Sequence, residues 1–331
     1  MAEIPTEAPG ETATVAAIYA AYEAANEPRD GRSISVSTLA EECERKLFYD
    51  FRWVSPHENI PGRTLRIFET GKLEETRWIE NLRMIGCEVV EFDGTDRDGN
   101  PKQIMVETCG GHVRGYLDAE ILGLPEAPTK WHVGEIKSHN TKSFAKLLKD
   151  GVRKSKPLHF AQIQTYMHKR GRDRGIYLAV NKDTDELYAE RLKLDVEYCL
   201  RLEARAQRII DANDPPAKLY EDPTAKMAFA CGWCRHRSVC HEGAAPRSNC
   251  RTCLYSSPEQ GGGWSCARFS KPLSIDEQAS GCPAHLWLPG LINGEQIDCS
   301  EEEEWIRYRM ADGTIWTDGA SNDNEEQQDA A

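Results

Sequence analysis

The amino-acid sequence predicts an α/β fold, in which a mixed central sheet is flanked by helices and followed by a cysteine-rich region. Three observations carry this prediction. Helical and strand-like stretches alternate over the first two thirds of the chain, and strand pairs stand on both sides of two helical stretches. Hydrophobic residues make up 40% of the 331 residues, which is enough to build a core. Seven of the twelve cysteines lie between Cys231 and Cys282.

The helical stretches are recognised by apolar residues that recur at helical spacing. Thr38 and Glu41 have the spacing of a capping box, so a helix carrying Leu39 to Phe51 is expected to start there. The other helices are expected at residues 15–26, 63–84, 143–149, 158–170 and 196–211.

The strand-like stretches are rich in β-branched and aromatic residues. They are expected at residues 87–92, 103–107, 112–122 and 131–138, and at 175–180 and 186–194, a pair joined by a turn. The organisation that follows is an N-terminal extension (1–35), a core (36–225), two cysteine-containing segments (226–245 and 246–290) and an acidic, partly disordered tail (291–331).

The charges are unevenly distributed along the chain. The formal net charge of −13 argues by itself against a polyanionic partner. Between Lys130 and Lys182, however, thirteen Lys and Arg residues stand against three acids, whereas twelve acids stand against two arginines from Glu295 to the end. A basic middle segment can bind phosphates while an acidic tail sets the total charge.

The sequence also indicates a compartment. No apolar run is long enough to span a bilayer, and the acidic N-terminus lacks the features of a secretory signal. We therefore expect a cytoplasmic protein with no membrane partner. In a reducing compartment, clustered cysteines indicate metal ligands rather than disulfides.

Asp118 and the Glu135-x-Lys137 pair form the main candidate site. Asp118 lies in the strand-like stretch GYLDAEIL, and Glu135 and Lys137 follow in another, GEIKS. Side chains two apart in a strand share a face, so Glu135 and Lys137 point one way while Ile136 points the other. If the two strands are neighbours, two carboxylates and one ammonium meet at one point.

Such a group suits phosphodiester hydrolysis with bound Mg²⁺ or Mn²⁺. Carboxylate oxygens are the ligands that these ions prefer. The ion stabilises the charge of the transition state and lowers the pKa of a bound water, and Lys137 would orient or help deprotonate that water. The competing interpretation is a solvated strand face, because an Asp followed by Glu-x-Lys often occurs by chance.

Further residues make the pattern more specific. Gln162 and Tyr166 lie four apart on one face of an expected helix, and Glu75 lies on the long upstream helix. The series Glu75, Asp118, Glu135-x-Lys137 and Gln162-x-x-x-Tyr166 resembles the motifs of the RecB-like PD-(D/E)XK nucleases over about residues 36–245. The resemblance is greatest to the iron–sulfur RecB-like exonucleases of CRISPR adaptation and to their phage relatives.

The resemblance implies a restriction-endonuclease-like PD-(D/E)XK core and a role for each residue. Asp118 and Glu135 would be metal ligands, with the carbonyl of Ile136 as a third, and Lys137 would be the catalytic lysine. Glu75 would be an accessory ligand at a place where many of these exonucleases have His. Gln162 and Tyr166 would position the metal or the DNA; without the other motifs they would be read as a helix-packing pair.

A first group of cysteines consists of Cys231, Cys234 and Cys240, with Cys43 as the natural fourth member. A structural zinc site or a 4Fe–4S cluster needs four ligands. The resemblance implies 4Fe–4S, acting as a structural clasp that closes a long loop. The alternative is that Cys43 is a core thiol and that the three late cysteines bind zinc with His236 or His241.

A second group consists of Cys250, Cys253, Cys266 and Cys282. Four thiolates with one C-x-x-C pair suit a tetrahedral Zn²⁺. A structural zinc ion contributes on the order of 10 kcal/mol to a module with little apolar core. We therefore expect a zinc module at residues 246–290.

The basic segment after Lys137 supplies candidate DNA contacts, whose affinity should fall as salt rises. Any one of these side chains is more often solvated than functional, and the cluster is the signal. The candidates are Lys142, Lys146, Lys149, Arg153, Lys154, Lys156, Arg170, Arg172 and Arg174.

The expected function is a DNA nuclease, acting as an exonuclease on ends or single strands. Its expected setting is phage recombination or DNA repair, with proteins of those processes as candidate partners, in a bacterial or phage-infected cell. One rival is a catalytically inactive DNA-binding or assembly module of the same fold. The other is an iron–sulfur redox protein, for which no flavin or nicotinamide glycine motif is present. No oligomeric state follows from the sequence.

Overall fold

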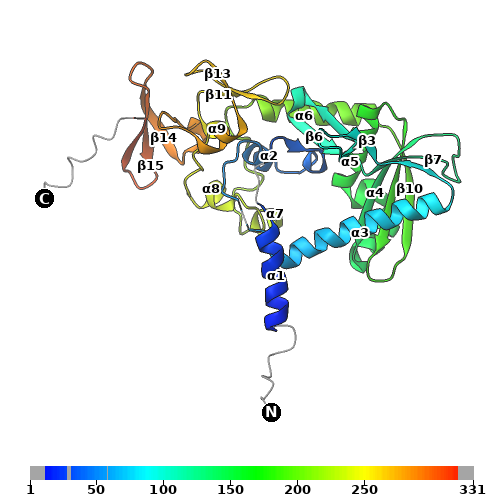
Figure 1. The fold of residues 1–331 in the computed structure, drawn as a ribbon. Helices are drawn as coiled ribbons and strands as arrows, with labels where there is room; N and C mark the ends of the chain where they lie inside the picture. Colours follow the sequence, from blue (N-terminus) through cyan, green and yellow to red (C-terminus); the bar gives the residue numbers. More distant parts are fainter. Residues whose placement is uncertain (1–11, 28–30, 58, 320–331) are drawn as a thin grey trace, which may run out of the picture. The chain divides into compact units, whose positions relative to one another are not determined.

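The computed structural model describes residues 12–27, 31–57 and 59–319 (Figure 1). The chain forms two compact units, each assembled from separate stretches. The first unit comprises Met1–Arg29, His57–Val106 and Gly115–Cys199, and the second comprises Asp30–Pro56, Glu107–Arg114 and Leu200–Ala331. The sequence predicts one core over residues 36–225, whereas the structure assigns three stretches of that range to the second unit.

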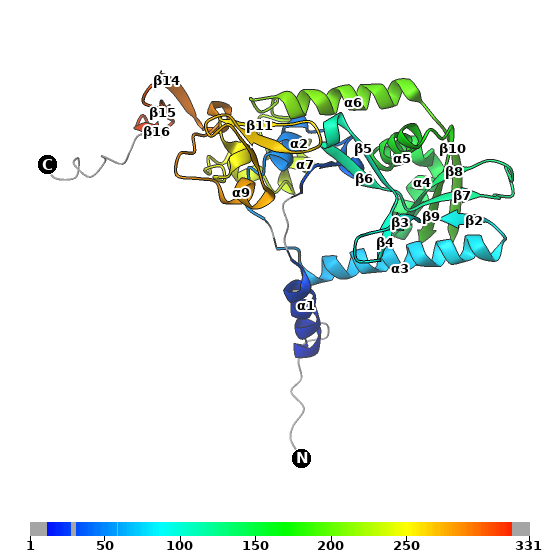
Figure 2. The same ribbon diagram turned by 45° about the horizontal axis from the view of Figure 1, so that its top comes forward.

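The first unit contains a five-stranded sheet of order β10-β9-β8-β7-β2 (Figure 2). Its strands are β2 (Glu88–Val90), β7 (Ala119–Leu122), β8 (His132–His139), β9 (Arg174–Asn181) and β10 (Leu187–Lys193). β8 and β9 are parallel and the other pairs are antiparallel. The parallel pair needs a crossover, which helices α4 (Thr141–Ser155) and α5 (Pro157–Arg170) provide. The predicted mixed α/β architecture is confirmed for this unit.

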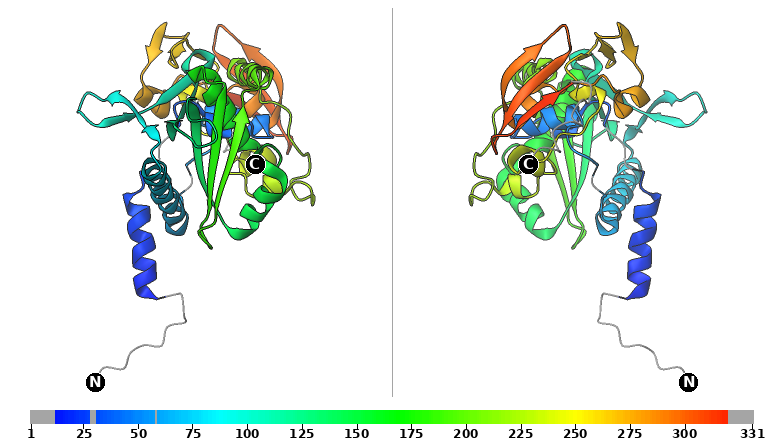
Figure 3. Two further views of the ribbon diagram at one scale, coloured as in Figure 1. Left: turned by 90° about the vertical axis from the view of Figure 1, so that its right-hand side faces the viewer. Right: turned by 90° about the vertical axis from the view of Figure 1, so that its left-hand side faces the viewer.

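Helix α3 (Gly62–Met84) covers the apolar face of this sheet, and Figure 3 shows it on one side of the strands. Its residues Trp78, Ile79 and Leu82 belong to one buried cluster with Ile136 and Leu178 of the sheet. Side chains alternate along a strand, so the neighbours of Ile136 and Leu178 must face away from α3. Helix α1 (Ala13–Ala25) packs on the first turn of α3.

Helix α5 covers the opposite face, which carries the polar side chains of β8. A Cβ atom at Gly175 would lie 2.9 Å from Cδ1 of Ile163 and 3.0 Å from Sδ of Met167, both on α5. Glycine at this position therefore permits the close approach of the helix to β9. Glu135 and Lys137 lie on this face, between the sheet and α5.

The remaining short strands of this part of the chain lie in a hairpin and at the points where the chain passes from one unit to the other. β3 (Phe92–Thr95) and β4 (Pro101–Gln103) form a hairpin in the first unit. β5 (Met105–Thr108) and β6 (Val113–Tyr116) contain the points where the chain passes between the units. In the second unit, β1 (Ile34–Ser35) pairs in parallel with the first residues of β6.

The second unit is built around helix α2 (Glu44–Phe51) and a group of aromatic and arginine side chains. The buried Arg251 lies 3.8 Å from the ring centroid of Trp53 and donates a hydrogen bond to the carbonyl of Phe51. Its remaining elements are α6 (Val196–Asp211, which begins in the first unit), α7 (Phe229–Gly232), α8 (Arg237–His241), α9 (Ile275–Ser280), β11 (Ser256–Pro258), β12 (Trp264–Cys266), β13 (Lys271–Leu273), β14 (Gly294–Ser300), β15 (Trp305–Met310) and β16 (Ile315–Asp318).

Two local predictions are wrong. Thr38 and Glu41 form no capping box: Ser35 caps a short 3-10 helix, and α2 starts at Glu44 with the Cys43 sulfur accepting from the amide of Lys46. The strand predicted over residues 112–122 is two strands with a bend at Asp118. Part of the expected acidic tail is ordered, because β14, β15 and β16 form an antiparallel sheet; the end of the chain, for which disorder is expected, lies outside the described residues.

Candidate functional site

Asp118 and Glu135 are brought together by the pairing of β7 with β8. Ala119 is the register partner of Gly134, so the residues next to them, Asp118 and Glu135, lie side by side. The backbone amide of Ile136 donates a hydrogen bond of 2.7 Å to Oδ2 of Asp118. This bond fixes the Asp118 carboxylate at the edge of β8, although Asp118 itself stands just before β7 rather than within a strand.

The ammonium of Lys137 lies among the oxygens that the sequence predicts as metal ligands. Its Nζ is 3.6 Å from Oδ2 of Asp118, donates a hydrogen bond of 3.0 Å to the carbonyl of Ile136, and forms an ion pair with Oε1 of Glu135. Three oxygens, two from β8 and one from the residue just before β7, thus lie around one positive charge. This arrangement fits a hard cation, which prefers the same donors.

Glu135 has a buried carboxylate with few compensating contacts. Its side chain is 0% exposed, and neither oxygen accepts a regular hydrogen bond; the described contact is the ion pair with Lys137. Burial raises the pKa of Glu135 to about 8, with Asp118 also raising it while Lys137 opposes the shift. Because a buried carboxylate without hydrogen-bond donors is costly, a further cation at this position would relieve the cost.

Glu75 extends the acidic group from helix α3. Burial, followed by the negative charge of Asp118, raises the pKa of Glu75 to about 7. The neighbouring Glu74 instead pairs with Arg77, at 3.6 Å, on the same helix. Glu75 therefore lies close enough to Asp118 for their charges to interact.

Gln162 and Tyr166 join the site from helix α5. Both are buried, and Nε2 of Gln162 donates a hydrogen bond of 3.3 Å to the hydroxyl of Tyr166. Burial, followed by the charge of Glu135, raises the pKa of Tyr166. All six residues of the motif series therefore belong to the first unit, with Glu75 on α3 and Gln162 and Tyr166 on α5.

Three further polar side chains that the motif series does not contain lie at the same sheet face: His139, His159 and Tyr177. The hydroxyl of Tyr177 lies 2.8 Å from Nε2 of His139 and 2.8 Å from Nδ1 of His159. Two spacings in the sequence indicate that the histidines belong with the site. Glu135, Lys137 and His139 alternate along β8, and His159 precedes Gln162 by one helical turn on α5.

The described residues contain no group of three or more His, Cys, Asp or Glu side chains already arranged to hold a metal ion. At the acidic site, the converging oxygens and the Lys137 ammonium among them match a Mg²⁺ or Mn²⁺ site.

The first group of cysteines lies in the second unit, where Cys43, Cys231, Cys234 and Cys240 line one small pocket. Its segments are joined by direct contacts, because Arg235 and His236 both bind Asp50 of α2. Four thiols around one space are a donor set that suits an iron–sulfur cluster or zinc. The structure thus places Cys43 beside the three late cysteines, although 188 positions separate it from Cys231 in the sequence.

His236 is already engaged on both ring nitrogens. Nδ1 lies 2.8 Å from Oγ of Ser55, and Nε2 lies 2.9 Å from Oδ1 of Asp50. A ring nitrogen in a hydrogen bond is not free to bind metal. This geometry disfavours the alternative in which His236 completes a zinc site with the late cysteines; His241 still lines the pocket.

The second group of cysteines also comes together within the second unit. Burial, followed by the nearby thiols of Cys253, Cys282 and Cys266, raises the pKa of Cys250 to about 11. The other three thiols therefore lie close enough to Cys250 to affect its ionisation. The four sulfurs come from a 3-10 turn (Cys250–Thr252), the residue after it, the end of β12 and the loop after α9.

The candidate DNA contacts fall into two classes. Lys142, Lys146 and Lys149 are exposed and follow one face of α4, and no ion pair is found for them among the described residues. The others have described partners: Arg153 with Asp195, Lys154 with Asp150, Lys156 with Ser143, Arg174 with Asp173, and Arg170 and Arg172 with the buried Glu120. Arg170 and Arg172 thus have a structural role in neutralising Glu120.

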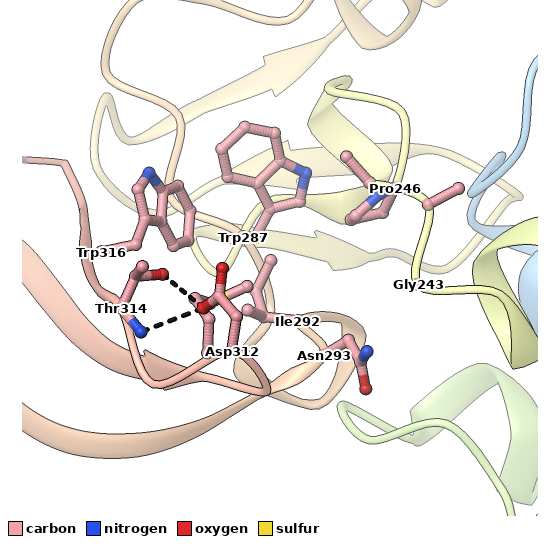
Figure 4. Close-up of a pocket in the computed structure, with 11 residues that line it drawn as sticks. Gly243, Pro246, Trp287, Ile292, Asn293, Asp312, Thr314 and Trp316 are labelled. Carbon is pink, nitrogen blue, oxygen red and sulfur yellow. Dashed lines mark hydrogen bonds between the residues drawn. The ribbon is translucent and has the colours of Figure 1, made fainter.

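A separate pocket of about 410 Å³ lies in the second unit (Figure 4). Trp287, Trp316 and Pro246 contribute apolar surface, and Asp312, held by Thr314 at 2.7 Å, is the charged residue among its described lining. No residue predicted for catalysis or metal binding lines it.

Among the helices in the described part of the chain, none has the length and apolar character that crossing a membrane requires. No protein-family model and no curated protein matches the chain.

Solved structures give weak similarities. The alkaline exonuclease LHK-Exo of Laribacter hongkongensis is 16% identical, with a TM-score of 0.37 over 59% of this chain and 90% of that one, and its complex with dAMP gives the same values. The structure of SSO0001 is also 16% identical, with a TM-score of 0.38 over 69% and 96%. These values establish no family, so a functional assignment must rest on the side chains of the site.

Proposed function

We propose that this protein is a divalent-metal-dependent DNA nuclease that hydrolyses phosphodiester bonds, acting as an exonuclease on DNA ends or single strands. The supporting observation is the position of the Lys137 ammonium among oxygens of Asp118, Glu135 and Ile136. These oxygens favour a cation strongly enough to hold an ammonium there. A Mg²⁺ or Mn²⁺ ion has the same preference and a higher charge.

Asp118, Glu135 and the carbonyl of Ile136 would hold this ion, with Glu75 as an accessory ligand. When bound, a divalent ion stabilises the negative charge that develops on phosphate and lowers the pKa of water. The rigid pairing of β7 with β8 holds the carboxylates at fixed positions. The chain therefore supplies a preorganised negative site, and little rearrangement of the backbone is needed.

In the hydrolysis, the oxygen of a water molecule forms a bond to phosphorus and the bond from phosphorus to the leaving oxygen breaks. The water loses a proton and the leaving oxygen gains one. Lys137 lies within reach of the acids and is the candidate to orient this water and to stabilise the added negative charge. Gln162 and Tyr166 lie on α5, which covers the same face of the sheet, and they would position the substrate.

The exposed lysines of α4 would carry the flanking DNA. Lys142, Lys146 and Lys149 follow directly after β8, which bears the acids. Contacts of this kind bind phosphates without reading bases. This arrangement suits an enzyme that acts on many sequences.

We further propose a structural 4Fe–4S cluster at Cys43, Cys231, Cys234 and Cys240, and a structural zinc ion at Cys250, Cys253, Cys266 and Cys282. The support is the common pocket of the first group and, in the second, the effect of the other three thiols on the pKa of Cys250. Neither group lies in the unit that carries the acids. Their proposed role is therefore to stabilise the second unit.

The test is a cleavage assay on end-labelled single- and double-stranded DNA with Mn²⁺ or Mg²⁺. The wild-type protein should release nucleotides, and Glu135→Gln should reduce the rate on the order of 10³–10⁴-fold, as for loss of a principal catalytic group. DNA binding and the iron and zinc content should remain. Equal rates for wild type and Glu135→Gln would refute the site, and an inert wild type that still binds DNA would favour the binding-module rival.

A further inference from the structure

A chain of hydrogen bonds runs through the polar layer beside the acids. Nζ of Lys156 lies 2.5 Å from Oγ of Ser143, which lies 3.2 Å from Nδ1 of His139. Nε2 of His139 then lies 2.8 Å from the hydroxyl of Tyr177, and this hydroxyl lies 2.8 Å from Nδ1 of His159. The three rings of this chain stack on one another. The hydrogen-bonded groups therefore follow one another in the order Lys156, Ser143, His139, Tyr177 and His159.

The lysine at one end sets the direction of every bond. An ammonium can only donate, so the hydroxyl of Ser143 accepts from Lys156. In the described residues, the acceptor within reach of the Ser143 hydrogen is Nδ1 of His139. A neutral imidazole that accepts on one nitrogen carries its hydrogen on the other. His139 therefore donates from Nε2 to Tyr177.

The same reasoning continues to the other end. The Tyr177 oxygen accepts from His139, so its own hydrogen is directed to Nδ1 of His159. His159 must then carry its hydrogen on Nε2. The reverse direction would leave the Ser143 hydrogen without an acceptor, since the Ser143 oxygen would accept from both Lys156 and His139. Every donor in the chain has an acceptor only when the hydrogen bonds run from Lys156 towards His159.

The free end of this chain is Nε2 of His159. This atom has no hydrogen-bond partner among the described residues, and it is not one of the fully enclosed atoms that lack a partner. It is therefore a donor that solvent or a ligand can reach. His159, Gln162 and Tyr166 lie on one face of α5, because they are separated by three and four positions.

The acids of the site lie in the same layer. Tyr177, which holds His159, is the register partner of Glu135 on the neighbouring strand. Burial, followed by the charge of Lys137, lowers the pKa of His159 to about 3. The ring is thus neutral at physiological pH and close enough to Lys137 to feel its charge. A neutral N–H group near Glu135 and Lys137 can donate a hydrogen bond to a phosphate oxygen of a bound substrate.

We propose that His159 donates a hydrogen bond from its neutral Nε2–H to a phosphate oxygen of the DNA substrate, and that Lys156, Ser143, His139 and Tyr177 hold it in this tautomer. This inference rests on the proposed nuclease function. A fixed donor aimed at developing negative charge accelerates a reaction without transferring a proton. Neutral imidazole is known to serve as such an electrophile. His159 is therefore a substrate-contacting residue, and the other four are positioning residues.

The first experiment compares His159→Phe, His159→Gln and Tyr177→Phe in single-turnover cleavage of an end-labelled single strand with Mn²⁺. Loss of one such donor lowers the rate on the order of 10²–10³-fold, so His159→Phe should show a loss of this size. His159→Gln keeps an amide donor and should recover part of the rate. Affinity for Mn²⁺ should be unchanged in all three variants. His168→Phe is the matched control, because nine positions along α5 place it on the opposite side of the helix.

The second experiment reads the tautomer directly, by nitrogen NMR of protein with ¹⁵N-labelled histidine. In the Glu135→Gln protein, His159 should show a protonated Nε2 and an unprotonated Nδ1, and an added oligonucleotide should shift the Nε2–H signal. Tyr177→Phe should let the two tautomers mix. An unprotonated Nε2, or a signal unmoved by the oligonucleotide, would overturn the proposal even if the enzyme is inactive. Wild-type cleavage by His159→Phe beside an inert Glu135→Gln would overturn it while leaving the nuclease assignment intact.

Discussion

Nζ of Lys137 lies 3.6 Å from Oδ2 of Asp118, on the same strand face as the Glu135 carboxylate with which it forms an ion pair. The ammonium of Lys137 and a bound metal ion would therefore compete for the same position between the acids. Without metal, the ammonium neutralises the acids. With metal bound between those acids, like charges repel, and the ammonium must move to the edge of the site. Its side chain is 27% exposed, so it has space to do so.

Removing this charge should separate catalysis from metal binding. We expect Lys137→Met to lose most cleavage activity but to bind Mn²⁺ at least as tightly as wild type, because the competing ammonium is gone. The metal-free variant should melt at a lower temperature, and saturating Mn²⁺ should raise that temperature by more than in wild type. Calorimetric titration and thermal melting provide the two readouts. Lys102→Met, on the exposed β4, is the control, and weaker Mn²⁺ binding in Lys137→Met would contradict this account.

Metal binding should depend on pH and release protons. Burial raises the pKa of Glu135 to about 8 and that of Glu75 to about 7, so both carboxyl groups gain or lose their proton between about pH 6 and 8. A metal requires the ionised carboxylates. Affinity for Mn²⁺ should therefore rise as the pH increases through about 6 to 8 and then level off. Titrations in buffers of different ionisation enthalpy count the protons, and a flat affinity profile would exclude the shifted acids as ligands.

The same pKa values predict the stability of the metal-free protein. The folded state binds these protons more tightly than the unfolded state, for which the ordinary value is 4.5. The contribution to stability is therefore fully present below about pH 4.5 and is lost as the pH rises towards 8. Denaturant unfolding of wild type and of Glu135→Gln at several pH values measures this term. The variant should have a flatter profile over this range.

The first cysteine group should hold iron and stabilise the second unit. A link between Cys43 and Cys231 closes a loop of nearly two hundred residues, and by the chain-entropy model such a closure contributes about 5 kcal/mol. We expect Cys43→Ser to lose the brown colour and the iron and to unfold at a lower temperature. Cys299→Ser, at an exposed thiol outside both groups, is the control. Full iron content in Cys43→Ser would exclude Cys43 as a ligand.

The second cysteine group should hold zinc independently of the first. Cys282→Ser should lower the zinc content by one equivalent without changing the iron content. Hydrogen exchange should accelerate around β11, β12 and β13, since the proposed zinc ion would tie these short strands, through Cys266, to Cys250, Cys253 and Cys282. Exchange in β8 and β9 should remain slow. Unchanged zinc in this variant would show that the four thiols serve no metal.

The lysines of α4 should govern DNA affinity rather than chemistry. Replacing Lys142, Lys146 and Lys149 by Gln should weaken binding and flatten its salt dependence by about 0.7 per lost single-strand contact. The rate at saturating DNA should change little. Binding measured at several salt concentrations, with Lys102→Gln as the control, tests this point. An unchanged salt slope would place the DNA path elsewhere.

Local sequence patterns predicted the sheet and the acidic site because both depend on strand alternation. Glu135, Lys137 and Ile136 take the faces that a two-residue period requires, and the pairing of β7 with β8 supplies Asp118. The capping box at Thr38 and Glu41 failed because the chain there makes a 3-10 turn before α2. His159 was overlooked because its role depends on Tyr177, eighteen positions away, and no local pattern reports that contact.

The alternation of the two units along the chain limits how the protein can be made or cut. The polypeptide changes unit near residues 30, 57, 107, 115 and 200. During synthesis, the stretches Asp30–Pro56 and Glu107–Arg114 leave the ribosome long before the C-terminal residues on which their own unit depends. Those early stretches must wait for the cysteine-rich part, so a chain that ends after β10 would carry the acids and still leave helix α2 without its packing partners.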